Sequence, residues 1–469
     1  MMVIDDIREY IKDLAVSFGA KDTAEYNKSY VERNNTGTEA LNDNGAYFGF
    51  IHPEEDLRGP FHDFSLTIFP SNNPEKAWLL CLGIGSNGFK NDYELATYPG
   101  LRRLFSKLVG ERGFCKSDFT DIETSLPKTI TGSDDLQHLK NTIKTYSKVL
   151  PVCRIIEDPT QKESKDIIAA FVAGYAKLRD WPSNETHRKA LSKALKPFLD
   201  QDIEDDTKKI EELLMQRQFI VIQGPPGTGK TRISKTIALN LRAKTFFTQF
   251  HAETSYSDFI YGIRPDINKD GLKYTEHIGC FTEAVRYAIQ HPGEKTLLIV
   301  DEINRANLSN VLGPVFYLFE HNMDIANTEI EIAPGLTVNE LPHNFYFIAT
   351  MNTADRSLAV VDFALRRRFA WYTLKPRALT SNEVAEYKFF DKEFSRVHEI
   401  FEWYASSTEL CLEPGQGYYI ATSEEAMMNR ITYELFPLIK EYLQEGLLKN
   451  AKEEFNSYFS EKINQSLFE

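Results

Sequence analysis

The chain of 469 residues is longer than one compact core usually allows, so its length predicts two or three domains. With 42% hydrophobic and 26% charged residues, it has the composition of an ordinary folded protein, which excludes general disorder. A net charge of −14 excludes a protein that coats nucleic acid over its whole surface, so any DNA site must be local.

The chain begins with acidic residues and no apolar h-region, and no apolar run approaches the roughly 18 residues that a membrane helix needs. We therefore expect a cytoplasmic protein without a membrane segment. The five cysteines are scattered and form no C-x-x-C pair. That spacing supports neither a disulfide framework nor a zinc site, and it favours a reducing compartment.

The first part of the chain predicts a separate α+β domain over residues 1–150. A helical pattern runs to about residue 30, and residues 34–44 form a polar loop rich in Gly and Asn. Short strand-like runs follow, separated by Gly and Pro, at residues 47–51, 64–69 and 78–82.

A basic segment follows at residues 101–116, where apolar residues recur at helical spacing. Two interpretations stay open for it: a solvated face, or a contact for DNA phosphates or another acidic partner. Its basic residues are Arg102, Arg103, Lys107, Arg112 and Lys116.

Helical patterns over residues 165–199, broken at Trp181 and Pro182, lead into an acidic stretch at residues 200–212. We expect a helical connector over residues 151–212. No internal repeat is evident along the chain, so a solenoid is not expected.

A short apolar strand at residues 219–223 is followed by a glycine-rich turn and then by a helical pattern. This order is typical of a phosphate-binding loop, whose backbone N–H groups and helix N-terminus surround the phosphates. In such a loop Lys230 reaches the outer phosphates and the Thr231 hydroxyl binds Mg²⁺. The alternative, a chance glycine turn, does not explain the complete order. The predicted nucleotide-binding residues are Gly224, Pro225, Pro226, Gly227, Thr228, Gly229, Lys230 and Thr231.

A second apolar strand, residues 296–300, ends in two adjacent carboxylates. Asp301 is expected to hold Mg²⁺, directly or through water, and Glu302 to orient or deprotonate the attacking water. Two carboxylates at a strand end could also be a solvated turn, but the glycine-rich loop upstream favours the catalytic interpretation.

A third apolar strand, residues 345–349, leads to Asn352, whose polar side chain could sense the γ-phosphate. Three consecutive arginines follow at residues 366–368. An arginine at such a place could enter a neighbouring subunit's site and stabilise charge on the γ-phosphoryl group. The alternative is an exposed basic helix end that complements the helix dipole.

Together these elements resemble the AAA+ superfamily, and two sequences resemble its McrB branch: DEINRAN at residues 301–307 and MNTADRSLAVVDFALRRRF at residues 351–369. The resemblance covers about residues 218–442. It implies an α/β fold with a P-loop αβα core over residues 213–376 and a helical lid over residues 377–469. It also implies Walker and sensor roles for Lys230, Thr231, Asp301, Glu302 and Asn352, with Arg367 or Arg368 as the arginine finger.

The resemblance further implies a ring, expected to be a hexamer, that hydrolyses GTP or ATP with Mg²⁺, with GTP weakly favoured. It implies a separate McrC-like endonuclease subunit in DNA restriction and anti-phage defence, with DNA contacted through the N-terminal domain or the partner. Two other functions remain open. One is a dynein-related or MoxR-like ATPase that remodels proteins, and the other is a nucleotide-gated sensor without DNA motor activity.

Several segments define the limits of this resemblance. SYSDFIYG at residues 255–262 resembles a family segment, placed towards the ring interior, that supports a pore or partner contact. GQGY at residues 415–418 resembles the family's G-H-S-Y, but Gln416 and Gly417 replace His and Ser, so a lid contact to nucleotide through those side chains is not expected.

The N-terminal 150 residues do not resemble the family's methylcytosine-reading domain. Tyr47, Phe64 and Trp78 could line a pocket for a flipped base, although aromatic residues on alternating strands more often form core. A nuclease-like set, Asp266, Asp270 and Lys273, has the wrong spacing, so we expect no nuclease activity in this chain.

Overall fold

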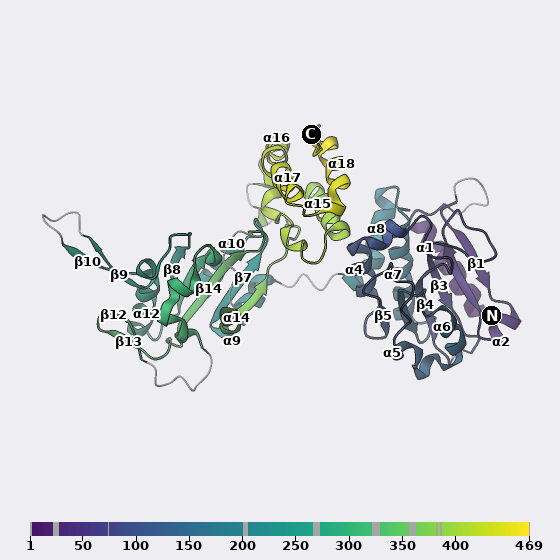
Figure 1. Ribbon diagram of the computed structural model, residues 1–469, viewed down its shortest axis with the longest axis horizontal. Coiled ribbons are helices and arrows are strands. Elements are labelled where there is room, and N and C mark those ends of the chain that lie inside the picture. Colours follow the sequence, from purple (N-terminus) through teal and green to yellow (C-terminus); the bar gives the residue numbers. More distant parts are fainter. Residues whose placement is uncertain are drawn as a thin grey trace. The chain divides into compact units, whose positions relative to one another are not determined.

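The computed structural model describes residues 2–21, 28–73, 75–199, 205–265, 273–320, 329–355, 363–380, 383–384 and 387–468. The chain divides into two compact units, the first built from Met1–Asp202 and Trp403–Ser406 and the second from Ile203–Glu402 and Ser407–Glu469 (Figure 1). Within the described ranges, no helix has both the length and the hydropathy required to cross a bilayer.

The first unit is organised around a six-stranded sheet in which every neighbouring pair of strands is antiparallel. The strand order is β1-β2-β3-β4-β6-β5. The strands are β1 (Val31–Asn35), β2 (Tyr47–Ile51), β3 (Phe64–Phe69), β4 (Trp78–Ile84), β5 (Gly113–Cys115) and β6 (Val152–Ile156).

Helices cover both faces of this sheet because its side chains alternate between two apolar clusters. Phe48, Phe64 and Leu80 belong to the larger cluster, whereas Leu79 and Cys153 belong to the smaller one. The larger cluster includes residues of α1 (Met2–Ser17), α4 (Pro99–Leu108), α7 (Lys162–Leu178) and α8 (Glu185–Leu199), and the smaller one residues of α5 (Lys128–Thr131) and α6 (Lys140–Tyr146).

The first unit extends past the boundary expected at residue 150. Strand β6 is an interior strand that pairs with β4 and β5, and α7 contributes to the larger apolar cluster. A connector over residues 151–212 is therefore not a separate region, because most of it completes the sheet and core of the first unit. The periodicity of α7 predicted a helix correctly, but it carried no information about which core the helix joins.

The beginning of the chain also differs from expectation. Helix α1 ends at Ser17, and Gly19 follows with a φ of 103°, a left-handed conformation that glycine adopts readily at helix ends. Part of the expected polar loop is the edge strand β1, and the rest includes α2 (Thr38–Asn42). Strand β1 has a polar sequence because it pairs with β2 at the edge of the sheet, where its side chains meet solvent.

The basic segment after residue 100 does not form one basic face. Lys116 is buried and its Nζ lies 2.7 Å from the carbonyl oxygens of Asp121 and Lys148. Arg112 pairs with Asp135 and Glu157. Lys116 and Arg112 thus make their contacts within the first unit. They do not belong to one continuous face that could bind DNA phosphates.

The second unit contains a five-stranded parallel sheet in the order β15-β7-β14-β11-β8. Both faces are covered, so its central strands have continuous apolar sequences, as parallel strands usually do. The strands are β7 (Phe219–Gly224), β8 (Lys244–Gln249), β11 (Thr296–Asp301), β14 (Phe345–Asn352) and β15 (Ala370–Thr373).

Each face of the parallel sheet has its own apolar cluster. Ile220, Ile299 and Ile348 lie in the cluster that includes residues of α9 (Asp206–Arg217) and α10 (Lys230–Asn240). Val221 and Phe347 lie in the cluster that includes residues of α12 (Cys280–Gln290). Helices on both faces of a parallel sheet give the expected αβα core.

Residues after the core form the helical lid that the sequence predicted, drawn in yellow-green to yellow in Figure 1. It contains a two-stranded antiparallel sheet of β16 (Lys388–Phe389) and β17 (Ile420–Ala421). Its α-helices are α15 (Asp391–Tyr404), α16 (Glu424–Arg430), α17 (Phe436–Gln444) and α18 (Lys452–Ile463).

Candidate functional site

The loop between β7 and α10 has the backbone shape of a phosphate cradle. Gly227 and Gly229 have φ values of 80° and 87°, which other residues adopt only with strain. The buried Thr228 hydroxyl donates a 2.9 Å hydrogen bond to the Pro225 carbonyl and closes the loop. Because α10 starts at Lys230, the N–H groups of its first turn have no partner within the helix and can receive an anion.

Lys230 is buried at the centre of this loop. Its Nζ donates to the carbonyl oxygens of Gly224 (2.9 Å) and Pro225 (2.8 Å) and to Oδ1 of Asn352 (2.5 Å). Burial lowers the pKa of Lys230 to about 8, although the carboxylates of Glu302 and Asp301 oppose that shift. The ammonium group is therefore held beside the loop at the expense of its hydration, and a phosphate would stabilise its charged form.

The strand order brings three functional strand ends together, because β14 lies between β7 and β11. The Thr231 hydroxyl donates to Oδ1 of Asp301 over 2.7 Å, and the Thr350 hydroxyl donates to the same oxygen over 2.5 Å. Hydroxyl and carboxylate oxygens are the ligands that Mg²⁺ prefers. Thr231 and Asp301 therefore fit the magnesium site that the sequence predicts.

Glu302 follows β11 in a left-handed conformation, with φ 56° and ψ 48°. Its N–H donates to the Thr350 hydroxyl over 3.1 Å, which holds that backbone in place. Its Oε1 accepts a hydrogen bond from Nδ2 of Asn352, and its buried Oε2 has no hydrogen-bond partner among the described residues. Burial raises the pKa of Glu302. These are the properties of a carboxylate that accepts a proton from a substrate.

Asn352 connects the cation and the carboxylate of the site, since it accepts from Lys230 and donates to Glu302. Asn304 donates to the Asn352 carbonyl over 3.3 Å. Arg305 lies 3.8 Å from Glu302 and 3.5 Å from Asp355. The sequence motifs alone assigned no roles to Asn304, Arg305 or Thr350, although all three lie in or next to the strand ends that carry those motifs.

The two arginine-finger candidates differ sharply in exposure. Arg367 has an exposed side chain (67%) and its Nη2 lies 2.7 Å from Oε1 of Glu320. Arg368 is 5% exposed, pairs with Glu320 as well, and stacks over the Phe316 ring at 3.8 Å. Arg366 is exposed and lies over Trp371 at 5.1 Å. The geometry favours Arg367 as the finger, because Arg368 is held in the interior.

These arginines lie away from the loop of their own chain. They belong to the end of α14 (Phe363–Arg368), immediately before β15, and β15 runs parallel to β7. They are therefore near the amino end of the sheet, whereas Lys230 and Asp301 lie near the carboxyl end. A strand of this length spans roughly 13 Å at about 3.3 Å per residue, so a finger from this segment would act on another subunit.

The lid contacts the phosphate loop through its backbone. The N–H groups of Gly415 and Gly417 donate to the carbonyls of Pro226 (2.9 Å) and Gly227 (2.8 Å). The buried Gln416 side chain donates through Nε2 to the Thr228 carbonyl over 2.7 Å. A Cβ at position 415 would lie 2.3 Å from the Gly227 carbonyl carbon, so only glycine allows this approach. Gln416 thus contacts the loop itself.

Other residues that the sequence singled out lie away from this site. Trp78 and Phe64 are buried in the larger cluster of the first unit and are core residues, whereas Tyr47 is half-buried. Lys273 is exposed. Two residues of the motif at residues 351–369 and two of the nuclease-like set lie outside the described part of the chain: Arg356, Ser357, Asp266 and Asp270.

One other cluster could in principle hold a cation. Among the described residues, His52, Asp63 and Asp92 have ligand atoms within 4.8 Å of one another. However, Asp92 pairs with Arg179 at 2.8 Å, and Oδ1 of Asp63 accepts three backbone N–H groups of residues 90–92. These contacts give the cluster a structural role.

The segment that carries this site is similar to known proteins. Residues 220–369 match the model of the AAA domain, dynein-related subfamily. The chain is 32% identical over 296 residues to the type IV methyl-directed restriction enzyme EcoKMcrB subunit of Escherichia coli strain K12, which covers 58% of this chain and 63% of that protein. It is 28% identical over 194 residues to component YdiS of the type II restriction enzyme BsuMI of Bacillus subtilis strain 168, covering 33% of this chain and 56% of that protein.

Among solved structures, NtrX from Brucella abortus in complex with ADP aligns at 13% identity and a TM-score of 0.27, covering 50% of this chain and 52% of that one. The chain spans between 56% and 63% of the length of the two curated relatives.

Proposed function

We propose, from the match of residues 220–369 to the AAA domain of the dynein-related subfamily, that the chain is a ring-forming NTPase that drives a separate McrC-like endonuclease in DNA restriction and anti-phage defence. The observation that carries the enzymatic part is the convergence of Lys230, Thr231, Asp301, Glu302 and Asn352 at three adjacent strand ends.

In the proposed reaction a water oxygen attacks the γ-phosphorus, the bond to the β–γ bridging oxygen breaks, and a nucleoside diphosphate and phosphate are released. Glu302 accepts the water proton, and its raised pKa brings the carboxyl closer to the pH at which it works. Asn352 holds that carboxylate and also contacts Lys230, so it positions the base relative to the phosphate. Thr231 and Asp301 would hold Mg²⁺, which would supply electrostatic stabilisation of charge on the phosphate oxygens.

We propose that the hydrolytic site is complete only at the interface between two subunits. Arg367 is exposed and lies near the opposite end of the parallel sheet from Lys230, so it suits the site of a neighbour. A closed ring satisfies this head-to-tail arrangement for every subunit, and we propose a hexamer.

The proposed partner and DNA function rest on the two restriction-system relatives. The chain matches only part of each, and the nuclease is assigned to a separate subunit. GTP is proposed as the preferred nucleotide on the strength of the McrB likeness, and DNA is proposed to contact the first unit or the partner.

The test is steady-state phosphate release from GTP and from ATP by the purified chain, each with and without double-stranded DNA and the candidate nuclease subunit. A GTP preference with strong stimulation by the partner is the expected result. ATP turnover that neither addition changes would contradict the restriction function and indicate a protein-remodelling ATPase. Slow turnover that controls only ring assembly would indicate a nucleotide-gated sensor.

A further inference from the structure

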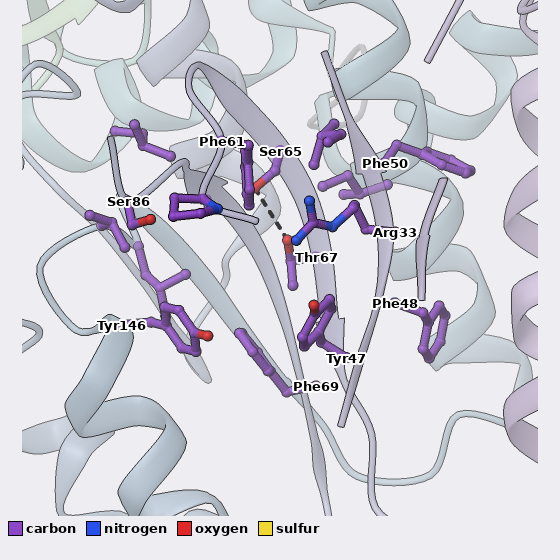
Figure 2. Close-up of a pocket in the computed structure, with 18 of the residues that line it drawn as sticks. Arg33, Tyr47, Phe48, Phe50, Phe61, Ser65, Thr67, Phe69, Ser86 and Tyr146 are labelled. Carbon is purple, nitrogen blue, oxygen red and sulfur yellow. Dashed lines mark hydrogen bonds between the residues drawn. The ribbon is translucent and has the colours of Figure 1, made fainter. Parts of the chain in front are cut away.

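The first unit contains a cavity of about 330 Å³ that no part of the proposed NTPase cycle uses. Figure 2 shows its lining residues beside β2 and β3. The floor is made of small residues, Gly49, Ser65, Thr67 and Gly83. A Cβ at position 49 would lie 1.9 Å from the Leu66 carbonyl oxygen, and one at position 83 would lie 2.9 Å from the Ser65 hydroxyl. A side chain at position 49 would overlap the backbone of β3, and one at position 83 would crowd Ser65, so both positions stay glycine and contribute no side chain to the cavity.

Aromatic rings surround the small floor. Tyr47, Phe61, Phe69 and Tyr146 line the cavity, and the rings of Phe69 and Tyr146 stack with centroids 5.8 Å apart. The Thr67 hydroxyl donates to the Ser65 hydroxyl over 3.2 Å, the dashed line in Figure 2. Aromatic walls with hydroxyl groups between them suit a planar ring that has a hydrogen-bonding edge.

A guanidinium group lies at the border of this cavity. Arg33 is half-buried, donates to the carbonyls of Asp56 (3.1 Å) and Gly59 (3.0 Å), and lies 5.4 Å from the centroid of the Phe61 ring. Among the residues that the structure describes, no carboxylate lies within salt-bridge distance of Arg33. A half-buried cation whose contacts are neutral carbonyls favours an anionic partner.

A second cleft, of about 460 Å³, shares Arg33, Tyr47 and Gly59 with the aromatic cavity. Its lining is polar and includes two further arginines, two amides and one carboxylate: Arg8, Arg58, Asn34, Asn35 and Glu32. Arg8 pairs with Glu32 at 2.7 Å, whereas Arg58 is exposed. An apolar ring site thus continues into a site for a charged group.

We propose that the first unit binds a nucleotide, with its heteroaromatic ring in the aromatic cavity and its phosphate beside Arg33 and Arg58. The two halves of the lining match the two halves of such a ligand, an apolar planar ring and an anion. A free nucleotide and a nucleotide within a single-stranded nucleic acid share this chemistry. The inference does not depend on the proposed function, because none of these residues belongs to the phosphate loop.

The test uses the full chain with Lys230→Ala, which removes nucleotide binding at the phosphate loop. Binding of a panel of nucleoside 5′-monophosphates and of single-stranded oligonucleotides is measured by calorimetry. We expect at least one of the two ligand types to bind. Arg33→Gln and Thr67→Trp, added separately, should each weaken that binding at least about tenfold, since one removes the cation and the other fills the cavity. Arg188→Gln changes the charge equally at an exposed position of α8 and should have no effect.

Thermal unfolding of each variant distinguishes a filled cavity from a misfolded unit. Preferential binding of the oligonucleotide would identify the natural ligand as single-stranded nucleic acid. Preferential binding of the monophosphate would identify it as a free nucleotide. The proposal is overturned if neither ligand type binds, or if a bound ligand is indifferent to both cavity variants while those variants remain folded.

Discussion

The phosphate-loop site of the second unit and the aromatic cavity of the first unit are built in opposite ways. In the phosphate-loop site, polar side chains bond to one another: Lys230 to Asn352, Asn352 to Glu302, and Thr231 to Asp301. In the cavity, small residues leave open volume and aromatic rings enclose it. Chemistry needs charges fixed before the substrate arrives, whereas recognition of a ring needs a shaped space. Variants should therefore affect one region and leave the other unchanged.

The largest expected effect is on turnover in Arg367→Ala. Removing an arginine finger should lower phosphate release by about 10³- to 10⁵-fold under conditions in which the ring assembles. Nucleotide binding and thermal stability should change little, because the side chain is exposed. Arg366→Ala is the matched control, since Arg366 is a neighbouring exposed arginine. Equal loss in both variants would remove the specific role of Arg367.

The next effect is that of Glu302→Gln, which keeps the shape of the side chain but removes the proton acceptor. Turnover should fall by about 10²- to 10⁴-fold, the usual contribution of a general base, while nucleotide binding and assembly persist. Because burial raises the pKa of Glu302, wild-type turnover should also decline on acidification at a higher pH than an ordinary glutamate would give. Comparable turnover in Glu302→Gln and wild type would rule out this role.

Arg368→Met should act on stability. Arg368 and Glu320 are both largely buried, but Arg367 stays paired with Glu320 when Arg368 is removed, so the free energy of unfolding should fall by less than the roughly 3 kcal/mol that an uncompensated buried charge costs. Chemical denaturation monitored by circular dichroism measures the loss. An unchanged unfolding free energy, together with lost turnover in the folded variant, would instead assign the finger to Arg368.

Gly415→Ala tests whether the lid and the phosphate loop act together. The added methyl would overlap the Gly227 backbone, and relieving such overlap costs about 2 kcal/mol, or about 30-fold in nucleotide affinity if the lid must move away. Gly293→Ala is the control, because a Cβ there meets no atom within 4 Å. Equal affinities in the two variants would show that the lid contact does not influence nucleotide binding.

The smallest effect concerns pH. Lys230 has a lowered pKa of about 8, and phosphate binds its protonated form. Nucleotide affinity should therefore be nearly constant below pH 8 and fall above it, by about tenfold between pH 7 and 9. Fluorescence titration with a labelled nucleotide, repeated at each pH from 7 to 9, measures this affinity. Affinity that rises with pH would contradict the assignment of Lys230 as the phosphate-binding cation.

The phosphate-loop site was largely predictable from the sequence, and the cavity was not. Lys230, Asp301 and Asn352 each follow or end an apolar strand, and parallel strands deliver such residues to one edge. The floor of the cavity depends on Gly49 and Gly83, whose contribution is the absence of a side chain. Its walls combine residues far apart in the chain, from Arg33 to Tyr146, which only long-range strand pairing brings together.

The same distinction, between local sequence patterns and contacts distant in sequence, explains where the predicted fold was wrong. Strand β6 and edge strand β1 join the sheet through partners distant in sequence, so local patterns placed the domain boundary too early and assigned part of β1 to a loop. The helix–strand order of the second unit needs no such information, because each parallel strand is followed by its own crossover.

The central claim is that the site is completed by a neighbouring subunit, and mixing two inactive variants tests it most directly. Lys230→Ala cannot bind nucleotide at its own loop but retains Arg367, whereas Arg367→Ala retains a complete loop but lacks the finger. In randomly mixed rings, roughly a quarter of the interfaces would join an intact loop to an intact finger, so phosphate release should reappear on mixing. If the mixture hydrolyses no more nucleotide than the two variants do separately, although mixed rings form, the site is not completed in trans by Arg367.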